Sequence, residues 1–231
     1  MKNSFSLNAL AWKWHMCSYV VCIYVKISFT ILALNGLAYS QWAKSVGGLA
    51  NDYGNSISMD ASGNVYVTGD YQGTADFDPG SGTTNLTSSG DYDIFFAKYN
   101  SLGELIWAKS VGSFGQDVYP YFTMDDNENI YLTGRFQQTV DFDPGEGTTN
   151  LTQSGGQSQF VAKYNSEGEL IWAKSMDGSG NNFICRGAVA DNSGNIYMVG
   201  SYFGTINVDP ILTSNGEEDI FFVKYNSEGE L

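Results

Sequence analysis

A nearly identical segment returns at almost constant spacing, and this repetition restricts the possible folds more than any other feature of the sequence. The segment KYNSLGELIWAKS occupies residues 98–110 and returns as KYNSEGELIWAKS at 163–175, which is 65 positions later. It begins a third time at Lys224, and its second half already occurs as WAKS at 42–45. Repetition at a fixed period indicates tandem copies of one supersecondary unit.

Each repeat contains four runs that have the composition of β-strands. In the first repeat these runs are 54–59, 64–69, 93–99 and 104–111, separated by Gly, Asn, Asp and Ser. Within the runs, aromatic and β-branched residues alternate with polar ones. The sequence shows no sustained apolar period of 3.6 residues, which a helix would need. We therefore expect an all-β chain.

Tight turns alternate with long connections between the predicted strands. Residues 60–64 (DASGN) and 100–104 (NSLGE) are predicted hairpin turns, because Asp or Asn opens each one and Gly supplies a positive φ near its end. Glu128 stands where the second repeat needs this Gly, which we expect to cost about 1 kcal/mol. The long connections, at about 71–92 and 111–118, should lie on the rim opposite the tight turns, where a functional site is expected.

Four antiparallel strands per repeat, in tandem, are typical of β-propeller blades. The third run of the first repeat places Phe95, Ala97 and Tyr99 on one face and Ile94 and Phe96 on the other. Apolar residues on both faces indicate a sheet packed between neighbours. Lysines in the fourth run are explained as charges that protect an outer edge strand.

The same residues resemble a known family. The segments GNVYVTG (63–69) and DIFFAKYNSLGELIWAKS (93–110), with their copies, are similar to the bacterial β-propeller repeat family often abbreviated SBBP. The resemblance covers essentially all of 41–231, although Glu128 and the truncated last repeat depart from the pattern. It implies a secreted or surface-attached bacterial propeller and supplies no catalytic residues.

The number of repeats predicts an incomplete ring. The repeats are about 42–106, 107–171 and 172–231, and the last one is incomplete. The leading strand, 41–47, has the sequence of a fourth strand, so it is able in principle to complete the last blade. Propellers typically have 4–8 blades, however, and three would require too sharp a wedge. We therefore expect an open arc, most simply a fragment, with the missing blades supplied by the rest of the protein or by another chain.

Residues 1–40 are predicted to be a signal peptide. They contain no Asp or Glu, an apolar run at 27–37, and small residues at the positions that precede a cleavage site after Ser40. Met16 is a possible alternative initiator. The alternative interpretation is a membrane anchor, but a bilayer span needs about 20 apolar residues and would enclose Lys26. We expect a secreted or cell-surface protein that is not inserted in a membrane after cleavage of 1–40, which leaves 41–231 as the repeat domain.

The composition excludes several classes of function. The whole chain carries a net charge of −14, and residues 41–231 hold all 25 acidic residues against eight Lys and Arg, giving 8 − 25 = −17. Such a charge disfavours nucleic acid and anionic lipid as partners. His15 and two of the three cysteines lie within the leader. The mature chain therefore has neither a histidine for a Ser-His-Asp triad nor a pair of cysteines for an internal disulfide.

The long connections carry a repeated acidic core that is a candidate calcium site. It reads DFDPG at 76–80 and at 141–145, and NVDP at 207–210. Alternating carboxylates supply the oxygen ligands that Ca²⁺ prefers, but Asp-Pro-Gly is equally the chemistry of a plain turn. The candidate ligands, with calcium the only cofactor considered, are Asp76, Asp78, Asp141, Asp143 and Asp209.

Aromatic residues at the start of these connections are candidates for stacking on sugar rings. They are Tyr71, Phe136 and Tyr202, and the alternative is that they pack beneath the loops. The neighbouring position varies in charge, as Asp70, Arg135 and Ser201. This variation predicts either solvated side chains or contacts with a partner that are specific to one repeat.

These features favour binding over catalysis. We expect a non-enzymatic extracellular scaffold for binding or adhesion, whose partner is a protein or a carbohydrate. The alternatives are a hydrolase or lyase that acts on glycans through two rim carboxylates, and a calcium-stabilised carbohydrate-binding module. No residue is assigned a catalytic role, and Cys185 is expected to be a buried small side chain.

Overall fold

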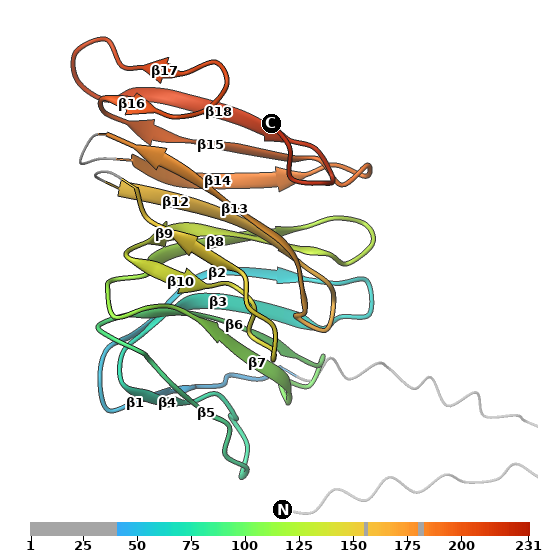
Figure 1. Cartoon of the computed structure of the whole chain (residues 1–231). Helices are drawn as coiled ribbons and strands as arrows, with labels where there is room; N and C mark the ends of the chain where they lie inside the picture. The colour runs from blue at the N-terminus through green and yellow to red at the C-terminus, as the bar shows by residue number, and fades with distance from the viewer. Residues whose placement is uncertain (1–40, 155–156, 180–182) are drawn as a thin grey trace, which may run out of the picture. The chain divides into compact units, whose positions relative to one another are not determined.

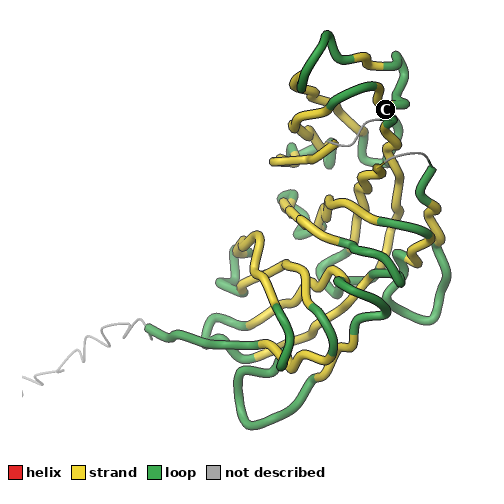
Figure 2. Tube along the Cα trace, turned by 90° about the vertical axis from the view of Figure 1, so that its left-hand side faces the viewer, coloured by secondary structure: helices red, strands yellow, loops and turns green. Residues whose placement is uncertain are grey.

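The computed structural model describes residues 41–154, 157–179 and 183–231 (Figure 1). Figure 2 shows strands and loops throughout this part of the chain, which confirms the all-β prediction. The described residues contain no helix that is long and apolar enough to cross a membrane. The predicted leader, its cleavage site after Ser40 and the alternative anchor lie outside them.

Three sheets carry the repeats, and the strands of each follow one another in the order of the sequence. The first sheet has the order β2-β3-β6-β7. Its strands are β2 (Asp52–Met59), β3 (Val65–Tyr71), β6 (Asp93–Tyr99) and β7 (Leu105–Val111). The strands of the second sheet are β8 (Val118–Met124), β9 (Ile130–Phe136), β12 (Gln157–Tyr164) and β13 (Leu170–Gly178). The third sheet has β14 (Phe183–Ala190), β15 (Ile196–Tyr202) and β18 (Asp219–Tyr225). The first two sheets therefore confirm four-stranded blades, and the described residues of the third form three strands.

The connection between the second and third strands of each blade contains a small hairpin that the sequence interpretation did not include. The hairpins are β4 (Thr74–Asp76) with β5 (Asn85–Thr87), β10 (Thr139–Asp141) with β11 (Asn150–Thr152), and β16 (Thr205–Ile206) with β17 (Leu212–Thr213). The third hairpin pairs with the end of the preceding blade, because Gly178 in β13 lies opposite Ile206. This pairing extends the second sheet to six strands in the order β17-β16-β13-β12-β9-β8.

The leading segment pairs with the first small hairpin in the same way as the end of the second sheet pairs with the third. Only Gly47–Gly48 (β1) is a strand, which is shorter than the predicted 41–47, and it pairs with β4 through Gly48 opposite Ala75. This repeats the contact between Gly178 and Ile206. Among the described strands, β18 pairs with β15 alone, so the leading segment does not close the third blade. The structure agrees with an incomplete propeller.

Neighbouring sheets bury each other's flanks. Ile94 and Phe96 of the first sheet join one core with residues of the second, and the rings of Phe96 and Tyr164 lie 4.7 Å apart. Val161 and Met176 of the second sheet join another core with residues of the third. The prediction that both faces of a blade are packed is confirmed for the second sheet.

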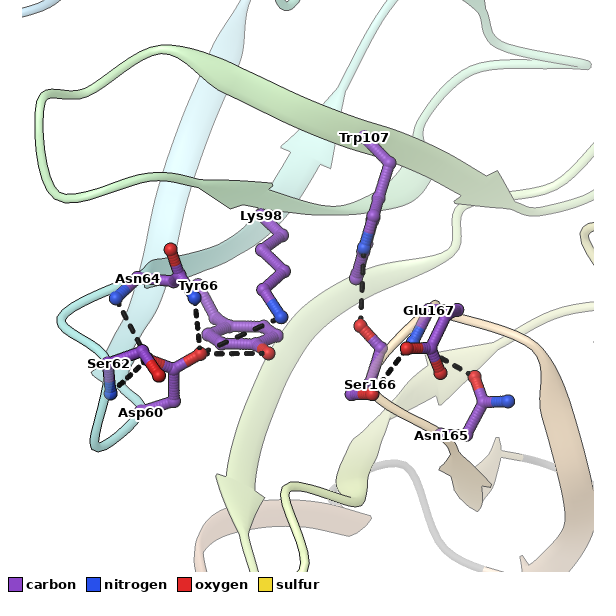
Figure 3. Close-up of polar contacts among 9 residues, drawn as sticks. All are labelled: Asp60, Ser62, Asn64, Tyr66, Lys98, Trp107, Asn165, Ser166 and Glu167. Carbon is purple, nitrogen blue, oxygen red and sulfur yellow. Dashed lines mark hydrogen bonds and ion pairs between the residues drawn. The ribbon is translucent and has the colours of Figure 1, made fainter.

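A network of polar contacts fixes the first tight turn of the first blade (Figure 3). Asp60 Oδ1 accepts hydrogen bonds from the main-chain N–H of Ser62 at 3.0 Å and of Asn64 at 2.9 Å. Lys98 Nζ lies 3.6 Å from Asp60 Oδ2 and 4.8 Å from the centre of the Tyr66 ring. Gly63 has φ +83°, as the predicted turn requires. These residues hold the rim opposite the long connections.

The corresponding turns of the other blades are built in the same way. Asp125 and Asp191 accept main-chain hydrogen bonds from the residues two and four positions further on. Glu128 has φ +62° at the position of Gly63, which confirms that the turn requires a positive φ there.

A tryptophan clasp joins each sheet to the next. We use this name for the bond from the indole N–H of Trp107 in β7 to the carbonyl of Ser166 at 3.3 Å (Figure 3). The ring covers the turn of the next sheet, where a Cβ added to Gly168 would lie 3.3 Å from it. Two further clasps run from Trp42 to Ser101 at 3.1 Å and from Trp172 to Ser227 at 2.9 Å. The repeated WAKS and YNS segments are thus the two halves of one junction.

The third sheet leaves one apolar flank exposed. Ile220 and Phe222 are 77% and 83% exposed, whereas Ile94 and Phe96, which occupy the same register in the first sheet, are 0% and 2% exposed. The difference arises because the second sheet covers Ile94 and Phe96.

Candidate binding groove between the first two blades

The predicted calcium ligands lie in the turns of the small hairpins. Asp76 Oδ1 accepts hydrogen bonds from the N–H of Asp78 at 3.0 Å and of Thr84 at 2.8 Å, and these bonds lower its pKa. Asp78 Oδ1 accepts from Gly80 at 2.7 Å. The second hairpin repeats this arrangement with Asp141 and Asp143, at 2.8–3.0 Å. Asp209 is exposed beside Pro210. These carboxylates therefore accept hydrogen bonds within their own turns, as the Asp-Pro-Gly sequence predicts.

The structure brings Asp76 and Asp78 to one cavity, of about 570 Å³, beside the leading segment. Asp52 also lines this cavity, and its Oδ2 accepts the N–H of Gly48 at 2.7 Å. Within the described ranges, no three acidic, His or Cys side chains converge as a metal site would require. Calcium binding by these loops therefore stays a prediction.

The aromatic residues that were candidates for sugar stacking lie in the core instead. Tyr71, Phe136 and Tyr202 are 0%, 1% and 5% exposed. The Tyr71 ring packs edge-on against Phe77 at 5.6 Å, and Phe77 is the aromatic residue of the DFDPG motif. These three residues pack beneath the loops, as the alternative interpretation predicted. The hairpin folds back over them, so their ring faces are closed to a ligand.

Asp70 makes a contact that is specific to one junction. It is 5% exposed, so it is not one of the solvated positions that its charge variation also allowed. Its Oδ1 accepts the main-chain N–H of Tyr119 in the second sheet at 3.3 Å. With its amide nitrogen turned toward the carboxylate, Asn55 donates to the same oxygen at 3.3 Å. Burial raises the pKa of Asp70, and these two bonds oppose the rise.

Irregularities in β2 and β8 place the residues that meet at Asp70. The pairing of β2 with β3 shifts between Gly54 and Ser56, which leaves Asn55 as the extra residue of a β-bulge. The pairing of β8 with β9 shifts between Val118 and Tyr121, across Tyr119. Tyr119 has φ +58°, a conformation that is uncommon for a bulky residue. A bulge turns side chains out of the alternation of the sheet, and here both bulges turn toward one junction.

The two bulges line a groove of about 470 Å³. We call it the Tyr53–Tyr119 groove; it is lined by Tyr53, Gly54, Asn55, Asp70, Tyr92, Gln116, Val118 and Tyr119. Its long-connection residues, Tyr92 and Gln116, pair as an isolated bridge between the two repeats. The groove therefore lies on the rim where the sequence analysis placed a functional site.

Aromatic faces and polar groups alternate along the groove. Tyr53 and Tyr119 are 52% and 53% exposed, and the Tyr53 ring lies 6.1 Å from that of Tyr92 at 36°. The guanidinium of Arg135 lies 5.8 Å from the centre of the Tyr119 ring. Interaction with the Tyr92 hydroxyl is the first cause of a raised pKa of Tyr53, so the Tyr53 phenol is a neutral donor at neutral pH.

Sequence reasoning missed this groove for a physical reason. The repeats placed aromatic candidates at matching positions, whereas the groove depends on residues that differ between repeats. In register, Tyr53 lies opposite Asp70, Val118 opposite Arg135 and Ile184 opposite Ser201. The varying charge at Asp70 was the available signal. The structure shows Asp70 buried against Tyr119 of the next sheet, and contact with a partner stays a prediction.

The fold and the repeated junctions define this chain as an array of β-propeller blades. The family described as Beta-propeller repeat, SBBP, matches residues 41–70. The chain therefore carries the repeat of this family, which confirms the resemblance seen in its sequence.

A comparison with a longer protein agrees with this assignment. An uncharacterized WD repeat-containing protein of Acanthamoeba polyphaga mimivirus is 31% identical over 197 residues, a match that covers 78% of this chain. The chain spans only 14% of that relative. This similarity also points to a propeller built from repeats.

Proposed function

We propose that this chain is a non-enzymatic binding scaffold that acts outside the cell, either secreted or attached to the surface. The proposal rests on a difference between polar residues that recur in every repeat and polar residues that occur in one repeat only. Carboxylates that recur between repeats, such as Asp60 and Asp76, bind the main chain of their own turns. The Tyr53–Tyr119 groove, by contrast, is built from residues that belong to one junction. The residues that recur in each repeat stabilise the fold, and the residues that differ between repeats form the binding surface.

Export is supported by the sequence of residues 1–40, which has no Asp or Glu, an apolar run at 27–37 and small residues before a cleavage site after Ser40. The test is expression of the full chain in a bacterium, followed by fractionation and N-terminal sequencing. We expect a product outside the cytoplasm that begins at Gln41. An uncleaved chain that stays in the cytoplasm contradicts the extracellular part of the proposal.

Binding without turnover is tested with the same exported protein. It is incubated with soluble polysaccharides and peptidoglycan, and both co-sedimentation and new reducing or unsaturated ends are measured. We expect retention on a polymer without cleavage. Cleavage that one carboxylate substitution abolishes would replace the scaffold with the alternative, a glycan-active hydrolase or lyase.

A further inference from the structure

We infer that the Tyr53–Tyr119 groove binds a neutral sugar residue of a glycan, with the tyrosine rings against the faces of the sugar and Asp70 accepting from its hydroxyls. This inference rests on the proposed binding function and names the ligand class for it. The groove volume, about 470 Å³, lies within the range of small-molecule sites.

The aromatic part of the site is open to a ligand. Tyr53 and Tyr119 each expose about half of their surface, 52% and 53%, although they come from different sheets. Tyrosine offers an apolar face together with a hydroxyl, which suits a sugar ring that has apolar faces and polar edges. The buried rings of Tyr71 and Phe136 lack this property.

The polar part of the site supplies acceptors and donors at the base and rim. Both hydrogen bonds to Asp70 end at Oδ1, so Oδ2 is the oxygen that a ligand hydroxyl can reach. Gln116 donates through Nε2 to Asp91 at 2.7 Å. The amide oxygen of Gln116 is then the second acceptor for a ligand. Asn51 donates to the Tyr92 hydroxyl at 3.3 Å and fixes that phenol at the rim.

Charge and desolvation select a neutral polyol among the possible ligands. The net charge of −17 on residues 41–231 and the Asp70 carboxylate both repel an anion. An apolar ligand would cover Asp70 without a hydrogen-bond donor, which is unfavourable for a buried carboxylate. A quaternary ammonium ion would neutralise Asp70 but would offer no hydrogen-bond donor to its Oδ2 or to the amide oxygen of Gln116.

The strained backbone at Tyr119 agrees with a binding role. Its φ of +58° is unfavourable for a bulky side chain, and the N–H bond to Asp70 holds it. Strain of this kind persists where the surrounding structure imposes it, often at ligand sites. Here it turns the Tyr119 ring into the groove.

The test uses the exported protein with defined probes, namely hexasaccharides of glucose, mannose and N-acetylglucosamine, and tetramethylammonium chloride. Binding is measured by saturation-transfer NMR and calorimetry. The variants are Tyr53→Ser, Tyr119→Asn, which tolerates the positive φ, and Asp70→Asn, which keeps an oxygen for the Tyr119 N–H. The control is Phe114→Ser, an 81% exposed aromatic residue in the same connection but outside the groove.

We expect a neutral hexasaccharide to bind at millimolar concentration or below. Tyr53→Ser and Asp70→Asn should each weaken binding about tenfold, as expected for a lost hydrogen bond or ring contact, and Phe114→Ser should leave it unchanged. Lack of binding by every sugar overturns the inference, as does binding that Tyr53→Ser, Tyr119→Asn and Asp70→Asn all leave intact.

Two outcomes separate this inference from the proposed function. Binding of tetramethylammonium in place of the sugars overturns the ligand class while the scaffold proposal stands. Cleavage of a bound sugar instead overturns the non-enzymatic scaffold and supports the sugar site.

Discussion

Trp107 and Ser166 lie in different sheets, 59 residues apart, and the indole N–H of the first donates to the main-chain carbonyl of the second at 3.3 Å. The acceptor is a backbone group, so the bond depends on the shape of the turn rather than on the serine side chain. Gly168 leaves room for the indole over that turn. The junction therefore joins one fixed ring to one fixed turn.

Substitution of Trp107 should weaken the junction in two steps. Trp107→Phe removes the hydrogen bond and should lower the free energy of unfolding by about 1 kcal/mol. Trp107→Ala also removes the ring and should lower it by about 3–5 kcal/mol. Urea denaturation followed by circular dichroism measures both. The control is Trp42→Phe, whose ring is 40% exposed and should matter less. Equal losses at Trp42 and Trp107 would contradict this account of the clasp.

Phe96 and Phe222 provide a matched test of burial between blades. Phe96→Ala should destabilise the chain by about 3–5 kcal/mol, because the ring is 2% exposed in the core shared by two sheets. Phe222→Ala should change stability by at most about 0.5 kcal/mol, because the same position is 83% exposed. Thermal and urea unfolding measure the difference. A large loss from Phe222→Ala in the monomer would show that this flank is covered.

Glu128→Gly should stabilise the second blade. The residue has φ +62°, where Gly63 and Gly194 occupy the matching turns, so Gly should gain about 1 kcal/mol. The control is Glu128→Ala, which removes the carboxylate but keeps a Cβ at positive φ. If both variants gain equally in urea denaturation, the cause is charge and not backbone strain.

Asp117 should make the stability depend on pH. It is 1% exposed, and burial raises its pKa from 3.8 to about 6, despite bonds from Gln137 and Ser113. A raised pKa means that the folded state binds the proton more tightly than the unfolded state. Its contribution is therefore fully present below pH 3.8 and is lost as the pH rises through about 6, by roughly 3 kcal/mol.

The measurement compares the wild type with Asp117→Asn in urea between pH 4 and pH 7. Asparagine does not titrate, so the advantage of the wild type should shrink as the pH rises across this window. A constant difference would mean that the pKa of Asp117 is not raised in the folded protein.

Calcium binding by the hairpin turns is tested by thermal unfolding. If the turns bind the ion, millimolar calcium should raise the melting temperature, and the double variant Asp76→Ala, Asp141→Ala should remove the shift. Asp60→Ala, in a turn on the opposite rim, is the control and should keep it. An unchanged melting temperature in calcium would assign these carboxylates to turn formation alone.

Features that repeat could be predicted from the sequence, because each copy reinforced the same interpretation. The strands of the first blade, the tight turns and the positive φ at Glu128 all followed from alternation and from the need for Gly. The packing of both faces of β6 followed from apolar residues on each side of it. These features depend on local chemistry and on a period that the sequence displays directly.

Features that depend on contacts between distant residues could not be predicted. The burial of Tyr71 depends on a hairpin that folds Phe77 back over it, and three-residue strands such as β4 carry too little pattern to be recognised. The groove depends on two bulges, at Asn55 and Tyr119, that interrupt the alternation used to find strands. Strand periodicity gives no information on where that periodicity breaks.

The tryptophan clasp also bears on how such an array changes length. Each junction uses the same donor and the same turn, with 59 residues between donor and acceptor in two junctions and 55 in the third. Duplication of one 65-residue stretch adds a blade and introduces no new kind of contact. The number of blades is thus free to vary between descendants of one gene while the joint stays the same, and a groove such as that of Tyr53 and Tyr119 can arise at one joint without disturbing the others.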